Sequence, residues 1–202
     1  MVIKIDVDGV IRNMFEEMCE VYNQQFNDNV KVEDIYDYRV DEVFTKVREE
    51  LHMSAHDYFF KKHSRRMFLD SKPYDGVCES INKLRDAGHK VVIVTWQFNL
   101  ENKMNTLLFL DKHNIQYDDI CFTKDKWMVY GDWMIDDNLG FILDEREKSR
   151  KILVDMPYNR NVENEFVIRV NNIVEAVDII LGEKKISKSK VDDIYIESVV
   201  SR

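Results

Sequence analysis

The stretch VIKIDVDGV, residues 2–10, decides the fold of this chain. Its first residues are mostly β-branched or apolar, and the run stops at Asp8 and Gly9, which is typical of a buried strand that ends in a tight loop. The stretch KVVIVT at 90–95 carries the same signal more strongly. Four further segments repeat it: 118–123, 132–136, 151–155 and 166–170. Such nearly continuous apolar runs predict a parallel sheet that is covered on both faces.

Helical patterns fill the intervals between these strands. One pattern ends at Gly88, a second has Asn99 at the position of an N-cap, and a third ends at Gly182. The apolar positions of the three patterns are, in turn, Val77, Ile81 and Leu84; Leu100, Met104, Leu107 and Leu108; and Ile173, Val177 and Ile180. Because strands and helices alternate, we predict a doubly wound, Rossmann-like α/β core that comprises residues 1–11 and 72–182.

Residues 12–71, between the first and the second strand, carry no convincing strand signal. Apolar residues recur there at helical spacing, and Ser54 with Asp57 three residues later resembles a capping box that opens a helix through Phe68. About sixty helical residues are too many for a simple crossover. We therefore predict a helical cap over the carboxyl edge of the sheet; the alternative is a helical excursion with no role at the site. Residues 183–202 form a tail of unknown role.

The charge of the chain limits the classes of partner. The 202 residues carry a formal net charge of −9, with a pI of about 5.1. An acidic chain is poorly suited to a nucleic-acid backbone, which needs a basic face, whereas a small phosphate ester is acceptable because a bound cation can reverse the local field. The N-terminal stretch is too short and too charged for a signal peptide, and no run of about 18 apolar residues predicts a membrane span. We expect a cytoplasmic protein without a membrane partner.

Four aspartates fall at the ends of two predicted strands. Asp6 and Asp8 close the first strand, and Asp136 and Asp137 close the segment at 132–136. In open α/β sheets, ligands bind outside the carboxyl ends of the strands, so the two pairs should converge on one place. Clustered carboxylates repel one another unless a cation lies among them, and Mg²⁺ suits such oxygen ligands. The pattern predicts a magnesium site; the alternative is a set of solvated turns.

Two further side chains fall at the same edge of the sheet. Thr95 ends the second strand and offers a hydroxyl and a backbone N–H. Lys126 follows the strand at 118–123, where an amine can pair with a phosphate oxygen and with a nucleophile. Taken alone, Thr95 could be a turn residue and Lys126 a surface lysine. Together with the aspartates they indicate a phosphate site.

The order of these motifs resembles that of the haloacid-dehalogenase-like phosphotransferases. DVDGV at 6–10, VVIVT at 91–95, TKDK at 123–126 and WMIDD at 133–137 match the four motifs of that superfamily, with a helical insertion after the first. The run FTKDKWMVYGDWMIDDN at 122–138 resembles the 5′(3′)-deoxyribonucleotidases more closely. That family has a basic residue followed by Asp and Lys. Further along come Gly-Asp and two apolar residues, which lead into Ile-Asp-Asp. The resemblance implies a phosphatase.

The resemblance also implies a role for each motif residue. Asp6 would be the nucleophile that forms an aspartyl-phosphate. Asp8 would protonate the leaving alkoxide and then activate the hydrolytic water. Thr95 and Lys126 would hold the oxygens of the transferred phosphoryl group. Lys124, two residues earlier, would help to orient the phosphate.

A set of metal ligands follows from the same resemblance. The implied ligands of Mg²⁺ are the Asp6 carboxylate, the Asp8 backbone carbonyl and Asp137. Asp136 would support these ligands without binding the metal ion directly, although the sequence alone does not decide which of Asp136 and Asp137 is the direct ligand. The metal ion and Lys126 would offset the repulsion between an anionic nucleophile and an anionic phosphate.

The chain departs from the nucleotidase pattern after its second motif. Trp96 follows the threonine where those enzymes usually have a small hydroxyl residue, and a lysine that is common a few residues later is replaced near Asn99. Both positions lie close to the expected phosphate or sugar. The differences there therefore bear on which substrate is bound, and they leave the expected reaction chemistry unchanged. Met14, Phe15 and Trp96 are candidates for contact with a base, with core packing as the alternative for each.

Three functions are compatible with this pattern. The first is a magnesium-dependent phosphatase for (deoxy)nucleoside monophosphates. The second is a phosphatase of the same superfamily for another small phosphate ester or for a nucleic-acid end, and the acidic charge weighs against the nucleic acid. The third is a non-catalytic binding or regulatory module, which is disfavoured because such a module does not need both a nucleophile and an acid.

Overall fold

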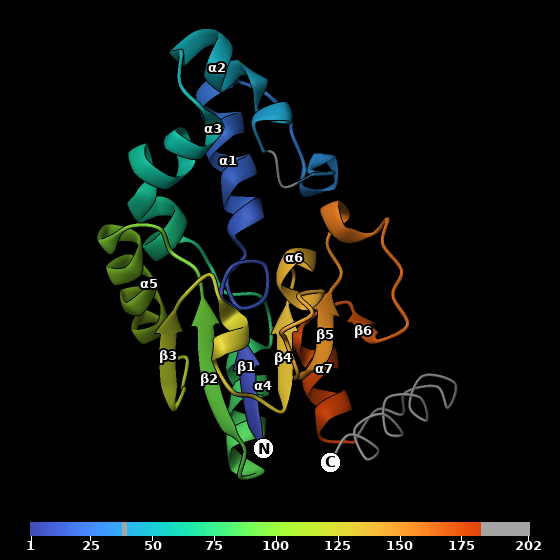
Figure 1. Cartoon of the computed structure of the whole chain (residues 1–202). Helices are drawn as coiled ribbons and strands as arrows, with labels where there is room; N and C mark the ends of the chain where they lie inside the picture. Colours follow the sequence, from blue (N-terminus) through green and yellow to red (C-terminus); the bar gives the residue numbers. More distant parts are fainter. Residues whose placement is uncertain (38–39, 183–202) are drawn as a thin grey trace.

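Six parallel strands form a sheet at the centre of the structure (Figure 1). The computed structural model describes residues 1–37 and 40–182. The strands are β1 (Val2–Ile5), β2 (Lys90–Thr95), β3 (Asp119–Phe122), β4 (Trp133–Asp136), β5 (Arg150–Val154) and β6 (Val167–Val170). Their order is β3-β2-β1-β4-β5-β6, and every neighbouring pair is parallel. The predicted parallel sheet is confirmed, and each of the six predicted segments coincides with a strand or overlaps one.

One face of the sheet carries the main hydrophobic core. Alternate β-branched side chains of the strands are buried there, as the period of two along a strand requires. Three helices contribute to the same core: α4 (Val77–Asp86), α5 (Leu100–Lys112) and α7 (Ile173–Ile180). On the other face the short helix α6 (Leu139–Ile142) packs on Met134 and Leu153 in a smaller cluster. Apolar cover on both faces fits the continuous apolar runs of the sequence.

The predicted ends of these helices are confirmed. Asn99 caps α5, because its side-chain oxygen accepts a hydrogen bond of 2.8 Å from the Asn102 N–H. Gly88 follows α4 with φ of +80°, the left-handed conformation that commonly ends a helix.

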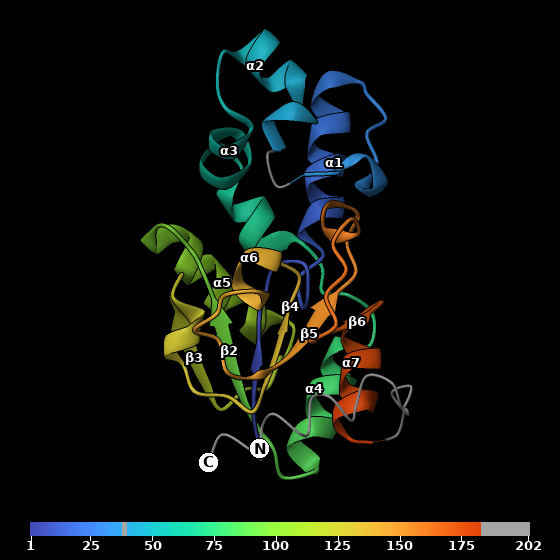
Figure 2. The same ribbon diagram turned by 45° about the vertical axis from the view of Figure 1, so that its right-hand side comes forward.

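A helical segment lies beyond the carboxyl ends of the strands (Figures 1 and 2). In the sequence it falls between β1 and α4. It has a hydrophobic core of its own, in which Phe44 packs edge-on against Tyr22 and Phe59. Its elements are α1 (Met14–Phe26), η1 (Val32–Asp34), η2 (Val40–Glu42), α2 (Thr45–Leu51), α3 (Ala55–Asp57), η3 (Tyr58–Lys62) and η4 (Arg66–Asp70). A helical cap inserted after the first strand is thus confirmed. Its limits as a domain, 12–71, stay a prediction.

The helix predicted from Ser54 to Phe68 is only partly correct. Ser54 does cap α3, since its Oγ accepts a hydrogen bond of 3.0 Å from the Asp57 N–H. Beyond Asp57 the chain continues as the two π-helical segments η3 and η4, with a turn at His63 between them. The capping motif therefore predicts where the helix begins, but apolar spacing alone does not predict where its regular geometry is lost.

Helix α5 turns its polar side inward, contrary to its sequence pattern. Leu100 and Met104 are exposed, whereas Asn102 and Thr106 are fully buried. The buried amide is satisfied, because the Asn102 side-chain oxygen accepts a hydrogen bond of 2.7 Å from the Ser64 hydroxyl of the cap. The helix lies where the sequence predicts it, but its predicted apolar face is not the face that packs on the sheet.

The three cysteines are free thiols, with Cys19 buried and Cys78 and Cys121 partly buried. Among the described residues no helix is long and apolar enough to cross a membrane. The predicted tail at 183–202 lies outside the described residues.

Candidate active site

Strands β1 and β4 bring two acidic segments together at the carboxyl edge of the sheet. Ile5 pairs with Ile135 in parallel register, and the Asp6 N–H donates a hydrogen bond of 3.0 Å to the Ile135 carbonyl. Asp6 therefore lies beside Asp136 and Asp137, as the sequence predicts.

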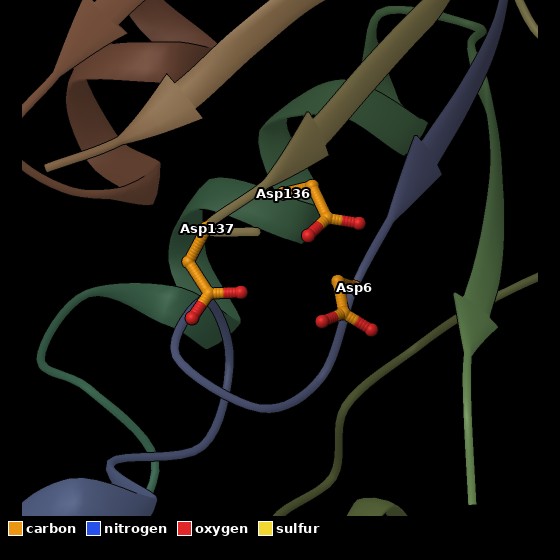
Figure 3. A group of neighbouring side chains, drawn as sticks. All are labelled: Asp6, Asp136 and Asp137. Carbon is orange, nitrogen blue, oxygen red and sulfur yellow. The ribbon is translucent and has the colours of Figure 1, made fainter. Parts of the chain in front are cut away.

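The carboxylates of Asp6, Asp136 and Asp137 form a buried cluster (Figure 3). The three side chains are neighbours, and one oxygen of each lies within 4.8 Å of the others. Burial raises the pKa of Asp136 to about 6, an effect that Lys126 opposes and the charge of Asp6 reinforces. Burial also raises the pKa of Asp137 well above its usual range, and repulsion from Asp136 and Asp6 adds to this rise. A cation at this cluster would relieve the repulsion.

The amine of Lys126 supplies one positive charge at the cluster. Lys126 begins the short 3₁₀ helix η5 (Lys126–Met128), and its side chain is buried. Its Nζ lies 2.6 Å from an Asp136 oxygen and 2.9 Å from an Asp6 oxygen. Burial lowers the pKa of this amine, but Asp136 and Asp6 raise it by more, so the pKa lies above its ordinary value and the lysine is protonated.

The remaining oxygens fit a hard divalent cation. Both Asp136 oxygens have donors, which are the Lys126 amine and the Asn138 N–H. Asp6 Oδ1 is buried and pairs electrostatically with Lys126, yet it accepts no well-oriented hydrogen bond from any residue that the structure describes. Three buried carboxylates face a single amine in this cluster, so a further positive charge would be stabilised there. Asp6 and Asp137 are therefore better suited than Asp136 to hold an ion such as Mg²⁺.

The position of Asp137 is fixed from two sides. The Tyr158 hydroxyl donates a hydrogen bond to the Asp137 carboxylate, and the Asn159 amide donates one of 2.8 Å to the Asp137 carbonyl. On the other side, Gly9 passes with φ of +78°, and a Cβ on it would clash with the Asp137 carboxylate. This loop therefore requires glycine, both for its conformation and for the close approach.

The carboxylate of Asp8 lies on the loop after β1 and is held at both oxygens. Arg12 Nη1 donates a hydrogen bond of 2.6 Å to one oxygen, and Gln97 Nε2 donates one of 2.7 Å to the other. Burial raises the pKa of Asp8; Arg12 opposes this rise and the charge of Asp6 reinforces it. A carboxyl group with a raised pKa holds a proton more readily than an ordinary aspartate, as an acid catalyst must.

A cavity of about 480 Å³ adjoins these charged groups. Eight of the residues predicted for the site line it: Asp6, Asp8, Met14, Phe15, Thr95, Trp96, Lys126 and Asp137. Phe60, Phe98 and Phe141 add further aromatic walls. A concave site with apolar walls and a few converging charged groups is typical of small-molecule binding.

Two predicted site residues do not line the cavity. Asp136 is fully buried behind Lys126, which contacts both Asp136 and Asp6. Lys124 is exposed, because the turn that directs Lys126 into the sheet edge leaves Lys124 at the surface. The structure gives no support to a phosphate contact by Lys124.

Sequence reasoning missed four residues that support the site: Arg12, Gln97, Tyr158 and Asn159. Arg12 and Gln97 each follow a recognised motif within a few residues. Tyr158 and Asn159 follow β5 at the same edge of the sheet as the motifs. That position is the signal that could have identified Tyr158 and Asn159.

Comparisons of sequence identify relatives of this chain. Residues 1–186 match the model of a family described as 5′ nucleotidase, deoxy (Pyrimidine), cytosolic type C protein. A protein of Chlorobaculum tepidum, provisionally named a 5′(3′)-deoxyribonucleotidase, is 26% identical over 147 residues. This match covers 68% of this chain and 70% of that protein.

Comparisons of structure identify the fold. L-2-haloacid dehalogenase from Xanthobacter autotrophicus superposes with a TM-score of 0.59 at 10% identity, over 90% of this chain and 98% of that one. D,D-heptose 1,7-bisphosphate phosphatase from B. bronchiseptica, in complex with magnesium and phosphate, superposes with a TM-score of 0.51 at 14% identity, over 91% and 99%. These likenesses confirm the haloacid-dehalogenase-like fold that the four motifs predict, and at such identities they concern the fold alone.

Proposed function

The chain belongs to the family of the deoxy (pyrimidine) 5′ nucleotidases of cytosolic type C, and on this premise we propose that it hydrolyses (deoxy)nucleoside monophosphates by way of a phosphorylated Asp6. Family membership makes the chain a hydrolase of the phosphatase class and argues against a non-catalytic module. The observation that carries the proposal is the position of Asp6 on the wall of the cavity. Its carboxylate lies beside the buried amine of Lys126 and two more carboxylates.

The proposed reaction has two steps. In the first, an Asp6 oxygen attacks phosphorus, the bond to the nucleoside oxygen breaks, and Asp8 gives its proton to that leaving oxygen. In the second, Asp8 takes a proton from a water molecule as the water attacks the aspartyl-phosphate. Inorganic phosphate leaves and the Asp6 carboxylate is restored. The raised pKa of Asp8 supports its role as the proton carrier.

Charge neutralisation is the main task of the surrounding residues, because phosphoryl transfer depends on positioning and electrostatics. Lys126, 2.9 Å from Asp6, would meet the phosphoryl oxygens as they approach the nucleophile. Thr95 is buried at the end of β2 and lines the same cavity, so its hydroxyl and N–H are suited to a second phosphoryl oxygen.

Magnesium belongs to the proposal as a bound cofactor. The Asp6 carboxylate, the Asp8 carbonyl and Asp137 would hold it, while Asp136 orients Lys126. When bound, Mg²⁺ supplies positive charge that offsets the repulsion between the carboxylate nucleophile and the phosphate. The three buried carboxylates, whose charge the single amine of Lys126 does not balance, support this assignment.

The walls of the cavity support a substrate with a flat aromatic base. Met14, Phe15 and Trp96 line it, together with Phe60 and Phe98. Its volume of about 480 Å³ lies within the range of about 300–1,000 Å³ that is usual for small-molecule sites. A nucleoside monophosphate would place its phosphate at the aspartates and its base on these apolar side chains.

A panel of phosphate esters tests the proposed function. Phosphate release is measured with deoxyribo- and ribonucleoside monophosphates, sugar phosphates and an aryl phosphate, with Mg²⁺ and with EDTA. We expect magnesium-dependent activity that is highest on nucleoside monophosphates. Activity on the aryl phosphate without activity on any nucleotide would overturn the substrate, and full activity in EDTA would overturn the role of the metal.

A further inference from the structure

The side chain of Arg12 is fully buried next to Asp8, on the loop that follows β1. Its Nη1 donates a hydrogen bond of 2.6 Å to Asp8 Oδ1, and its Nη2 donates one of 3.0 Å to the Thr106 hydroxyl of α5. The guanidinium carbon lies 4.4 Å from the centre of the Phe109 ring and 5.3 Å from that of Phe68. Burial of an arginine is costly unless it is paired, so this position is built around its contact with Asp8.

The guanidinium of Arg12 does not face the substrate cavity. Asp8, Gln97 and Phe68 line that cavity, whereas Arg12 contacts Asp8 and Phe68 and is not among the lining residues. A phosphate ester in the cavity would therefore meet Asp8 and not the guanidinium. An effect of Arg12 on the reaction has to act through the groups that Arg12 contacts.

The backbone of Arg12 is fixed at several points of the loop. The Arg12 N–H donates a hydrogen bond of 2.8 Å to the Val7 carbonyl, and the Arg12 carbonyl accepts one of 3.1 Å from the Gly9 N–H. Arg12 also forms isolated β-bridges with Asp8 and Pro73. Because the backbone is held at these points, the guanidinium approaches Asp8 from a defined direction.

Two donors hold the Asp8 carboxylate at opposite oxygens. Arg12 holds Oδ1 from the loop after β1, and Gln97 Nε2 donates a hydrogen bond of 2.7 Å to Oδ2 from the segment after β2. Rotation about the Cβ–Cγ bond of an aspartate is otherwise loosely restricted, so donors on both oxygens set the plane of the carboxylate. Each oxygen has two lone pairs, so Asp8 can still exchange a proton with a group in the cavity.

We propose that Arg12 is a positioning residue that fixes the plane of the Asp8 carboxylate for both proton transfers of the reaction. The proposal rests on the proposed function, in which Asp8 gives a proton to the leaving oxygen and then takes one from the attacking water. Both transfers need an Asp8 oxygen within hydrogen-bond reach of its partner, and a carboxylate that rotates freely spends less time in that geometry. Arg12 itself neither gains nor loses a proton.

The dependence on the leaving group tests the first proton transfer. A nucleoside alkoxide needs protonation as it leaves, whereas p-nitrophenolate leaves without it. The ratio kcat/KM reports the steps from free enzyme and substrate to the first irreversible transition state, here the transfer to Asp6. Arg12→Met should lower kcat/KM on a nucleoside monophosphate about 10- to 100-fold and should change kcat/KM on p-nitrophenyl phosphate much less. Equal losses on both substrates would indicate a purely structural role and would overturn the proposal.

A burst of p-nitrophenolate tests the second proton transfer. Arg12→Met should release the first equivalent of p-nitrophenolate at about the rate of the wild type, because that step does not need the acid. Later equivalents should appear more slowly than in the wild type, because hydrolysis of the phosphorylated Asp6 still needs Asp8 as the base. Later turnovers as fast as those of the wild type would contradict a role of Arg12 in this step.

Further variants separate orientation from charge and from folding. Thr106→Val keeps the charge and loosens the grip, so it should show the same preference for p-nitrophenyl phosphate more weakly. Arg12→Lys keeps the charge without the planar fork, so it should restore only part of the loss; full recovery would show that the charge suffices. If Arg12→Met does not fold, Thr106→Val decides, and an unchanged ratio of its two kcat/KM values would overturn the proposal.

Arg85→Met is the matched control for the substitution. Arg85 lies on α4, and its Nη1 faces an Asp118 oxygen at 3.6 Å. Asp118 directly precedes β3, at the opposite edge of the sheet from the candidate site. This variant also loses an arginine that faces an aspartate, but it should keep the kcat/KM of the wild type on both substrates. A loss confined to the nucleotide in Arg85→Met would remove the significance of the same result for Arg12→Met.

Asp8→Asn separates this proposal from the proposed function. Asp8→Asn should be severely impaired on nucleotides, and full activity of that variant would overturn the proposed mechanism itself. If Asp8→Asn is impaired while Arg12→Met matches the wild type on both substrates, only the role of Arg12 is overturned.

Discussion

Removal of the buried amine of Lys4 should cost a large part of the stability of this protein. Lys4 lies on β1, and its Nζ contacts the Glu147 carboxylate at 2.6 Å, the Val129 carbonyl at 3.0 Å and the Lys126 carbonyl at 3.3 Å. Lys4→Met keeps most of the side-chain volume but leaves the buried Glu147 without its cation. Breaking a buried pair in this way costs about 3–5 kcal/mol.

The double variant Lys4→Met/Glu147→Met separates the charge from the other contacts. With both charges removed, no uncompensated carboxylate is left. The double variant should therefore recover about 2–3 kcal/mol of the unfolding free energy that Lys4→Met loses. Recovery should be incomplete because the Val129 carbonyl still lacks the Lys4 amine, whereas the Lys126 carbonyl keeps its hydrogen bond from the Val129 N–H. Activity should fall in the single and in the double variant, since Lys4 anchors the turn that carries Lys126.

Urea unfolding of the wild type, both single variants and the double variant measures this coupling. Lys90→Met is the matched control, because Lys90 lies on β2 and pairs with Asp118 at 2.9 Å at an exposed position. It should lose no more than about 1 kcal/mol, as exposed pairs do. A loss of that small size for Lys4→Met, or a double variant no more stable than Lys4→Met, would show that the buried pair does not stabilise the fold in this way.

Three further predictions concern the candidate site. Gly9→Ala should cost about 1–2 kcal/mol in thermal unfolding, because of its left-handed backbone, and should raise the Mg²⁺ concentration needed for activity by displacing Asp137; an unchanged magnesium requirement would contradict this. Tyr158→Phe removes the hydroxyl that bonds Asp137 and should weaken Mg²⁺ binding about 10-fold in calorimetry; wild-type affinity would show that this hydrogen bond does not orient the ligand. Lys124→Ala should leave kcat/KM within about twofold, whereas Thr95→Val should lower it ~100-fold; the reverse ranking would mean that the phosphate lies on the other side of the site.

The sheet and its motif residues could be predicted because structural and chemical signals coincide in the sequence. Asp6, Thr95 and Asp136 each end or directly follow an apolar run. Parallel strands that end at one edge leave little freedom in where the following side chains lie. This constraint is why the sequence predicts the convergence of the aspartates without any knowledge of the loops.

Contacts between distant segments could not be predicted in this way. An arginine such as Arg12 is usually a surface residue, and only the folded chain brings Phe109 and Thr106 around it. The same holds for α5, where apolar spacing predicts a helix but not the face that packs. Asn102 is buried because the cap offers it hydrogen-bond partners, and such partners cannot be read from local periodicity.

The most direct test of covalent catalysis by Asp6 is to look for a phosphoryl group on this residue during turnover. The enzyme is mixed with a deoxyribonucleoside monophosphate and Mg²⁺, quenched rapidly in acid, digested, and analysed by mass spectrometry. We expect a phosphate adduct on the peptide that contains Asp6, its loss in EDTA, and no turnover by a folded Asp6→Asn variant. Rapid turnover without the adduct, or full activity of Asp6→Asn, would contradict the central role of Asp6.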